Sequence, residues 1–266
     1  MASEAGARGK ALPKGVIMGI PRSPVQVRER STCHHNISSY VNSRPKPGSG
    51  VDDDLWTKWY IDEHLPDLVN SKTSTRAAFY RETHDFALAT KVPHPRKFLA
   101  LYQTDFEEPL KSKNYLDGVR HSSGMWPQSK QTSEVGDFDA RNYKLIQEYD
   151  PNKTGDSAPP FLLTVEMEPT EQNEGDFDDW YRQEHLELLS KLPGYRRSLR
   201  YVIGPKTPIT QGEPPKYLAI HEIDNPRAFD GKEAEAANTT KWTVKHINEA
   251  KSFTPRMWQR VTAEGF

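Results

Sequence analysis

Two histidines, His64 and His185, occupy matching places in two similar stretches of the chain. The stretch WYIDEHLPDL begins at Trp59 and WYRQEHLELL begins at Trp180, and six of the ten positions are identical. On a helix, residues four apart share one ridge, so each histidine should stand among aromatic side chains. Burial there lowers a histidine pKa, which leaves the ring neutral near pH 7 and able to accept a proton. The pattern predicts acid–base chemistry; the alternative is a core histidine bonded to a carbonyl or hydroxyl group. The two ridges are Trp56, Tyr60, His64 and Leu68, and Phe177, Tyr181, His185 and Leu189.

The two copies differ beside the histidine. The second copy adds Leu188 and Leu192 on the His185 face, which predicts a closed, packed surface. The first copy has Asp67 and Ser71 at the corresponding positions, and Pro66 disturbs the helix. Polar residues beside a buried histidine favour an open pocket. We therefore expect one working pocket, in the first copy, with His64 as the proton carrier.

Other residues can be assigned to this pocket by their type and position. Tyr60 and His121 are expected to support His64 in catalysis, although a surface loop is an alternative place for His121. A core role is the alternative for Tyr102 and for its partner His221. The expected substrate-binding residues are Trp56, Trp59, Asp67, Phe79, Tyr102, Met125, Trp126 and His35, and the equivalents in the second copy are His185, Tyr181 and His221.

Metal and nucleotide sites are not predicted. Cys33, His34 and His35 are adjacent, and adjacent residues rarely bind one ion together; no second ligand cluster has zinc-like spacing. His34 or His35 is instead expected to contribute to a lid over the pocket. The chain has no glycine-rich phosphate loop, serine nucleophile elbow or HExxH motif. We expect neither a metal nor an organic cofactor.

The similarity between the two copies extends over most of the chain. KFLALYQTD (97–105) matches KYLAIHEID (216–224), and FDARNYKLI from Phe138 aligns with FTPRMWQRV from Phe253. The matches keep their order and nearly keep their spacing, which indicates an internal duplication. We expect a first repeat over residues 1–155, with a long insertion at 21–50, and a second repeat over 156–266.

Each repeat reads as β-α-β-β-α-β, the ferredoxin-like unit of the α+β class. The expected first strands are residues 15–20 and 161–167, and the expected histidine helices are 55–71 and 176–192. A four-stranded sheet with helices on one face must cover the other face, and two repeats can do this for each other by packing sheet to sheet. We therefore predict a barrel built within one chain. Leu99, Leu101, Leu218 and Ile220 should face the opposite repeat, and Ala100, Tyr102, Ala219 and His221 should face the helices.

Composition excludes several classes of protein. The 266 residues carry a net charge of −1, which gives no basic surface typical of nucleic-acid binding. No apolar run approaches the roughly 20 residues that span a membrane. The amino-terminal residues have no apolar core typical of a secretory signal, so we expect a cytoplasmic protein. A homodimer is possible but not required for the fold.

The histidine helices resemble those of the EthD-like branch of the dimeric α+β barrel superfamily. That branch has a W-Y-x-x-x-H-x-P helix, matched here by Trp59, Tyr60, His64 and Pro66, and a Leu-Pro-Gly turn, matched at 192–194. The second copy lacks the proline, having Glu187 in its place. The relatives usually pair two small subunits, so this chain would be a tandem version.

The resemblance implies a cavity between helix and sheet that holds an apolar ligand, with histidine as the acid–base group. Relatives include cofactor-independent decarboxylases, dehydratases, cyclases and monooxygenases. We expect a cofactor-independent enzyme, of lyase or cyclase type, that acts on an aromatic or polyketide-like small molecule in secondary or aromatic-compound metabolism. The alternatives are a non-catalytic binding or structural barrel and, beyond that, a heme-dependent or cofactor-free oxygenase.

Overall fold

Eight strands and two groups of helices make up the computed structural model, which describes residues 37–84 and 94–266. In the first half the elements are β1 (Ile37–Pro45), α1 (Asp53–Trp59), a π-helical turn (Tyr60–His64), α2 (Leu65–Asn70), β2 (Arg76–Thr83), β3 (Phe98–Thr104), α3 (Lys113–Gly118), α4 (Thr132–Val135) and β4 (Gly136–Tyr149). In the second half they are β5 (Phe161–Glu168), α5 (Glu174–Trp180), a second π-helical turn (Tyr181–His185), α6 (Leu186–Leu189), β6 (Tyr195–Lys206), β7 (Tyr217–Ile223), α7 (Lys232–Asn238), α8 (Lys241–Glu249) and β8 (Ser252–Glu264).

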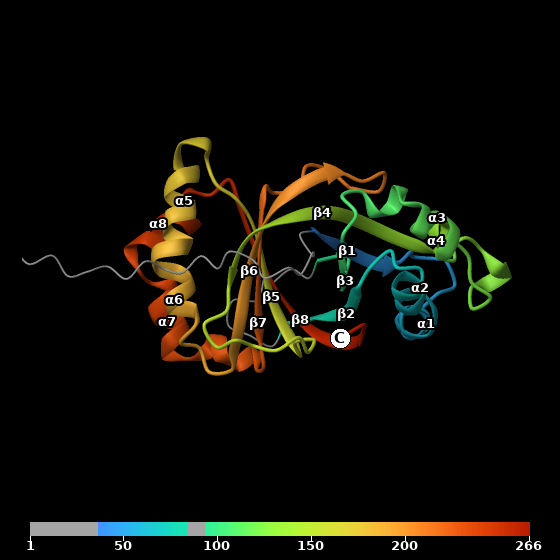
Figure 1. Ribbon diagram of the computed structural model, residues 1–266, viewed down its shortest axis with the longest axis horizontal. Helices are drawn as coiled ribbons and strands as arrows, with labels where there is room; N and C mark the ends of the chain where they lie inside the picture. The colour runs from blue at the N-terminus through green and yellow to red at the C-terminus, as the bar shows by residue number, and fades with distance from the viewer. Residues whose placement is uncertain (1–36, 85–93) are drawn as a thin grey trace, which may run out of the picture. The chain divides into compact units, whose positions relative to one another are not determined.

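The strands close into one antiparallel barrel in the order β1-β3-β2-β8-β5-β7-β6-β4. Four neighbouring strands come from each half, and the β2–β8 and β4–β6 ladders join the halves. Helices α1–α4 lie on one side of the barrel and α5–α8 on the other (Figure 1). Closure pairs every strand on both sides. The predicted fold, a barrel of two ferredoxin-like halves within one chain, is confirmed. A domain division at residue 155 stays a prediction.

The first strand lies elsewhere than predicted. β1 is Ile37–Pro45, inside the segment 21–50 that we had interpreted as an insertion, so that interpretation is wrong for residues 37–45. The run at 15–20 lies outside the described residues. The strand was missed because it is polar: Ser39, Asn42 and Ser43 are buried and hydrogen-bonded to side chains of distant segments. Partners far away in sequence thus allow an otherwise unfavourable burial.

The predicted alternation of faces is confirmed on β3 and β7. Leu99, Leu218 and Ile220 pack inside the barrel with aromatic residues such as Tyr80 and Trp258. Ala100 and Tyr102 belong instead to the layer between the first sheet and its helices, and Ala219 belongs to the corresponding layer of the second half. The molecule therefore has three separate cores, one in the barrel and one under each group of helices.

Two arginines inside the barrel connect the halves. Arg256 of β8 donates from Nε and Nη2 to the carboxylate of Glu82 on β2, over 2.7 and 3.1 Å, and from Nη1 to Oδ1 of Asn42 over 2.6 Å. Arg141 of β4, which aligns with Arg256, donates to Glu166 of β5 and to Asp139. Each arginine thus reaches from its own half into the other half.

In the described residues no helix is both long enough and apolar enough to cross a membrane.

Replacing Arg256 with methionine should lower the free energy of unfolding by about 3–5 kcal/mol, because the Glu82 carboxylate would stay buried without its counter-charge. Urea unfolding of the full chain measures this. Lys58, which pairs with Asp62 on the exposed face of the first helix, supplies the control. Lys58→Met should change the same free energy by less than about 0.5 kcal/mol. An equally small effect for Arg256→Met would show that the pair across the barrel does not hold the halves together.

Candidate functional site

A π-helical turn shapes the histidine helix in both halves. The backbone N–H of Leu65 bonds to the carbonyl of Tyr60, and that of Leu186 to the carbonyl of Tyr181, five residues earlier in each case. Because the second copy has Glu187 where the first has Pro66, the proline is not the cause of the turn. Single π-helical turns within helices are frequent at functional sites.

The turn brings residues five apart into stacking contact. The Trp59 and His64 rings lie 4.4 Å apart at 18°, and Trp180 and His185 lie 4.3 Å apart at 30°. The predicted four-residue ridge does place Tyr60 beside His64, edge to face at 5.3 Å. The stack itself could not be predicted from a regular helix of 3.6 residues per turn.

His64 combines a partly exposed ring with a buried, unpaired nitrogen. Its Nδ1 atom is buried and has no hydrogen-bond partner in the described part of the chain, and the Tyr102 hydroxyl is also buried, beside the hydroxyl of Tyr60. The His64 and Tyr102 rings lie 6.2 Å apart. Burial lowers the pKa of His64 to about 4, with His121 adding to the drop and Asp67 opposing it. The imidazole is therefore neutral at pH 7 and can accept a proton.

Aromatic side chains fill the layer around His64. Tyr60 stacks on Phe79 at 3.8 Å, and its hydroxyl lies 3.2 Å from Oγ of Ser43. The predicted residues Trp56, Trp59 and Trp126 have ring centroids 5.1–5.8 Å apart. Met125 packs against the same cluster. These residues lie together in a packed apolar layer, and neither this cluster nor the hollows described below shows the open pocket that was expected beside His64.

Asp67 and His121 lie at the outer edge of this layer. The Asp67 carboxylate accepts hydrogen bonds from Nε and Nη2 of Arg120, at 2.8 and 2.9 Å, and Glu63 lies 3.4 Å from Nη1. Arg120 was not among the predicted residues, and its link to Asp67 spans 53 residues. His121 is exposed, with its ring 5.3 Å from that of Tyr115. His35 lies outside the described residues, as do His34 and Cys33.

The equivalent positions of the second half carry a different set of contacts. His185 is buried, and its Nδ1 lies 3.5 Å from Oγ1 of Thr243, which also accepts from Nε1 of Trp180. His221 contacts Ser198 through Nδ1, at 2.7 Å. Burial lowers the pKa of both histidines to about 3. Tyr181 is covered by the guanidinium of Arg200, 4.2 Å from the ring centroid, where Tyr60 is covered by Phe79.

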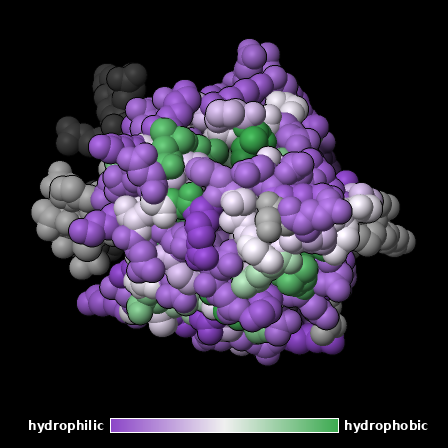
Figure 2. Space-filling model, turned by 90° about the vertical axis from the view of Figure 1, so that its right-hand side faces the viewer, coloured by the Kyte–Doolittle hydropathy of each residue, from purple (hydrophilic) through white to green (hydrophobic). Residues whose placement is uncertain are grey.

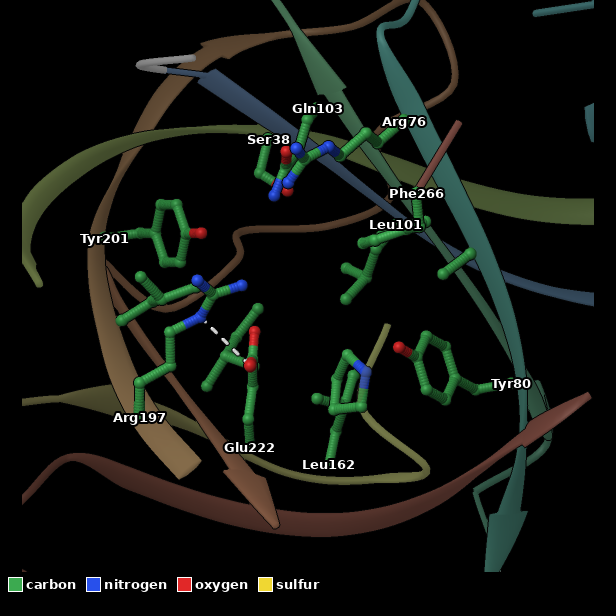
Figure 3. A pocket seen from close by; sticks show the side chains of 14 residues that line it. Ser38, Arg76, Tyr80, Leu101, Gln103, Leu162, Arg197, Tyr201, Glu222 and Phe266 are labelled. Carbon is green, nitrogen blue, oxygen red and sulfur yellow. Dashed lines mark ion pairs between the residues drawn. The ribbon is translucent and has the colours of Figure 1, made fainter. Parts of the chain in front are cut away.

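Two hollows lie away from both histidines. One is a cavity of about 30 Å³ inside the barrel, into which the hydroxyls of Tyr80 and Tyr201 point, close to the ion pair of Arg197 and Glu222 (Figure 3). It has room for a few water molecules, whereas ligand pockets usually measure about 300–1,000 Å³. The other is an open hollow beside the turn after β1. Neither is lined by His64.

The surface over α1–α4 is mostly hydrophilic, with separate hydrophobic spots (Figure 2). Ile61 and Leu116 are exposed on these helices. Within residues 37–84 and 94–266, no group of three or more His, Cys, Asp or Glu side chains is placed to hold a metal ion.

Comparison with known proteins identifies the fold. No protein-family model matches the chain. The chain is 27% identical over 180 residues to core atranone cluster protein 1 of Stachybotrys chlorohalonatus, covering 62% of this chain and 73% of that protein. An anthrone oxidase-like protein superposes with a TM-score of 0.54 at 10% identity, covering 88% of this chain and 94% of that one. A candidate monooxygenase of Fusobacterium nucleatum gives 0.51 at 10% identity, covering 87% and 95%.

The described residues of the chain have the dimeric α+β barrel fold. At 10% identity the structural similarity concerns the fold alone. The chemistry of the candidate site around His64 therefore has to be argued from its side chains.

The buried His221 should make stability depend on pH. Its pKa is about 3 in the folded chain and about 6.5 in an unfolded chain, so the unfolded state binds its proton first as pH falls. The contribution of neutral His221 to the free energy of unfolding is therefore complete above about pH 6.5 and is lost as the pH falls from 6.5 to 3. Between pH 7 and 5 this residue should lower the free energy of unfolding by about 2 kcal/mol. His221→Asn should reduce the decline by that amount in urea unfolding at the two pH values; an unchanged decline would contradict the assignment.

Proposed function

We propose that this chain is an enzyme that moves a proton on an aromatic or polyketide-like small molecule, with His64 as the acid–base group. The observation that carries the proposal is the buried atom His64 Nδ1, which has no hydrogen-bond partner among the described residues and whose ring lies 6.2 Å from the ring of Tyr102. Unsatisfied buried polar atoms are costly and often mark a functional position. His185, by contrast, lies within reach of Thr243 and is more completely buried.

The names of similar proteins support a place in secondary metabolism. The curated relative belongs to an atranone cluster, and one structural neighbour is called anthrone oxidase-like. We further propose that the chain belongs to the EthD-like branch and arose by tandem duplication. The repeated Trp-Tyr-x-x-Glu-His motif and the identical order of elements in both halves support this assignment.

The proposed chemistry begins with proton transfer to neutral His64. An aromatic substrate that loses a proton from carbon or from a phenol forms an anion delocalised over its ring. The Tyr102 hydroxyl, whose pKa is raised by burial and by nearby tyrosines, remains protonated and can donate a hydrogen bond to a substrate oxygen. Such an anion can lead to decarboxylation, loss of water or ring closure, with His64 returning the proton.

A cofactor-free oxygenase is the second candidate, favoured by the names of the two structural neighbours. The first step would be the same, because removal of a proton also prepares an electron-rich aromatic for reaction with molecular oxygen. The two candidates differ in their need for oxygen. Substrate consumption measured by mass spectrometry with and without oxygen therefore separates them.

His64→Gln should lower turnover about 10²- to 10⁴-fold, the usual contribution of one acid–base group. Hydroxylated anthrones and aromatic polyketide acids form the substrate panel, and circular dichroism checks the fold. His185→Gln is the matched control and should keep turnover within a few fold. If His64→Gln retained wild-type turnover with an intact fold, another group would have to carry the proton.

The heme alternative has a direct test in the absorption spectrum of the purified protein. We expect no Soret band, because the proposed step needs only a neutral imidazole and a hydroxyl donor. A band that disappears in His64→Gln would instead identify His64 as an axial ligand.

A further inference from the structure

Two buried nitrogen atoms of the second half have unmet hydrogen-bonding capacity. Arg200 Nη2 and His221 Nε2 have no partner anywhere in residues 37–84 and 94–266, although their side chains belong to residues only 2% and 1% exposed. Arg200 lies opposite Ala219, and His221 lies opposite Ser198, on the paired strands β6 and β7. Arg200 and His221 are therefore diagonal neighbours on the face that meets the helices, within reach of each other for long side chains, and Arg200 acts electrostatically on His221.

Arg200 brings a cation whose charge is only partly compensated. Its Nη1 atom donates to Oδ1 of Asp178 at 2.8 Å and to Oε1 of Gln147 at 2.6 Å. The Asp178 side chain is 39% exposed, and its other oxygen accepts from Arg182. Burial lowers the pKa of Arg200, but an arginine remains charged at pH 7. The Nη1 atom of Arg200 is thus paired with a partly exposed carboxylate, whereas its Nη2 atom is buried without a partner among the described residues.

His221 presents an N–H group to the same region. The Tyr195 hydroxyl lies 2.8 Å from Oγ of Ser198 and 3.2 Å from the carbonyl of Tyr149. If the tyrosine donates over the shorter distance, the serine hydroxyl can donate to Nδ1 of His221, 2.7 Å away. In that arrangement the ring hydrogen of the neutral histidine lies on Nε2. Both unpartnered atoms are then donors, and one belongs to a cation.

We propose that Arg200 and His221 bind the carboxylate group of a small organic acid in the second half of the barrel. Two carboxylate oxygens can accept one hydrogen bond from each donor, in a charge-assisted contact. The small side chains of Ser198 and Ala219 stand between the donors, and the ring of Tyr181 backs the guanidinium.

Among the described residues of the first half, the corresponding positions carry no such pair of donors. Phe79 lies opposite Ala100, as Arg200 lies opposite Ala219. Tyr102 lies opposite Ala77, as His221 lies opposite Ser198. Phe79 and Tyr102 therefore occupy the positions that Arg200 and His221 have in the second half. The cation is therefore peculiar to the second half. The inference does not depend on a catalytic role for His64.

Acetate and its neutral isostere acetamide test the site on the full chain at constant ionic strength. Acetate should raise the unfolding temperature in proportion to the logarithm of its concentration once that exceeds the dissociation constant, because it binds only the folded state, and acetamide should not. Arg200→Met should weaken acetate binding at least about tenfold, the value of a lost charge-assisted hydrogen bond. Arg182→Met, which removes the other cation bound to Asp178, should leave acetate binding within twofold.

An absent acetate effect, an effect that rises linearly with acetate concentration as a general solute effect would, an equal effect of acetamide, or an unchanged affinity in Arg200→Met would each overturn the proposal. If Arg200→Met does not fold, imidazole ¹⁵N–¹H spectra of the wild-type chain decide. The His221 Nε2–H signal, assigned by its loss in His221→Asn, should move with acetate and stay fixed with acetamide. A signal that does not respond to acetate overturns the site.

Discussion

One buried arginine from each half reaches across the barrel, and the arrangement of the molecule depends on these two contacts. Arg256 pairs with Glu82 and Arg141 with Glu166, so each half supplies a cation to an acid of the other. Burying an ion pair is costly unless its hydrogen bonds are complete, and Arg256 also donates to Asn42 and to the carbonyl of Arg96. These contacts require both halves in one register, which fixes how the helices on the two sides stand relative to the shared sheet.

The sequence was sufficient for the fold because its strongest signals are local and repeated. The alternation of Leu99 and Ala100, and of Leu218 and Ala219, predicts which face of each strand meets the opposite half, and the structure confirms it. The first strand was missed for a different reason. Ile37–Pro45 is polar, and its burial depends on partners more than 100 residues away, such as Asn142 for Ser39.

The cluster around His64 was predictable in its members more than in its geometry. Tyr60, His64 and Trp59 follow from the repeated motif, yet the stack of Trp59 on His64 arises from a π-helical turn, which shifts the register by one residue. Arg120 carries no signal of its own, since a surface arginine reveals a partner such as Asp67 only when the chain has folded. The repeated motif and the helical spacing therefore identify which residues lie together, whereas hydrogen bonds between distant segments determine the charge and pairing of each side chain.

The two helix–sheet layers share a scaffold and differ in charge. Both have a tryptophan stacked on a histidine at the π-helical turn, and both place a polar residue at one position of the third strand, Tyr102 or His221. On the neighbouring strand the first half has Phe79, which stacks on Tyr60, while the second has Arg200, which covers Tyr181 with a cation. A neutral aromatic wall suits an apolar molecule, and a buried cation suits an acid. The charge of the two layers therefore differs through side chains at corresponding positions of paired strands, Phe79 and Tyr102 in one half and Arg200 and His221 in the other.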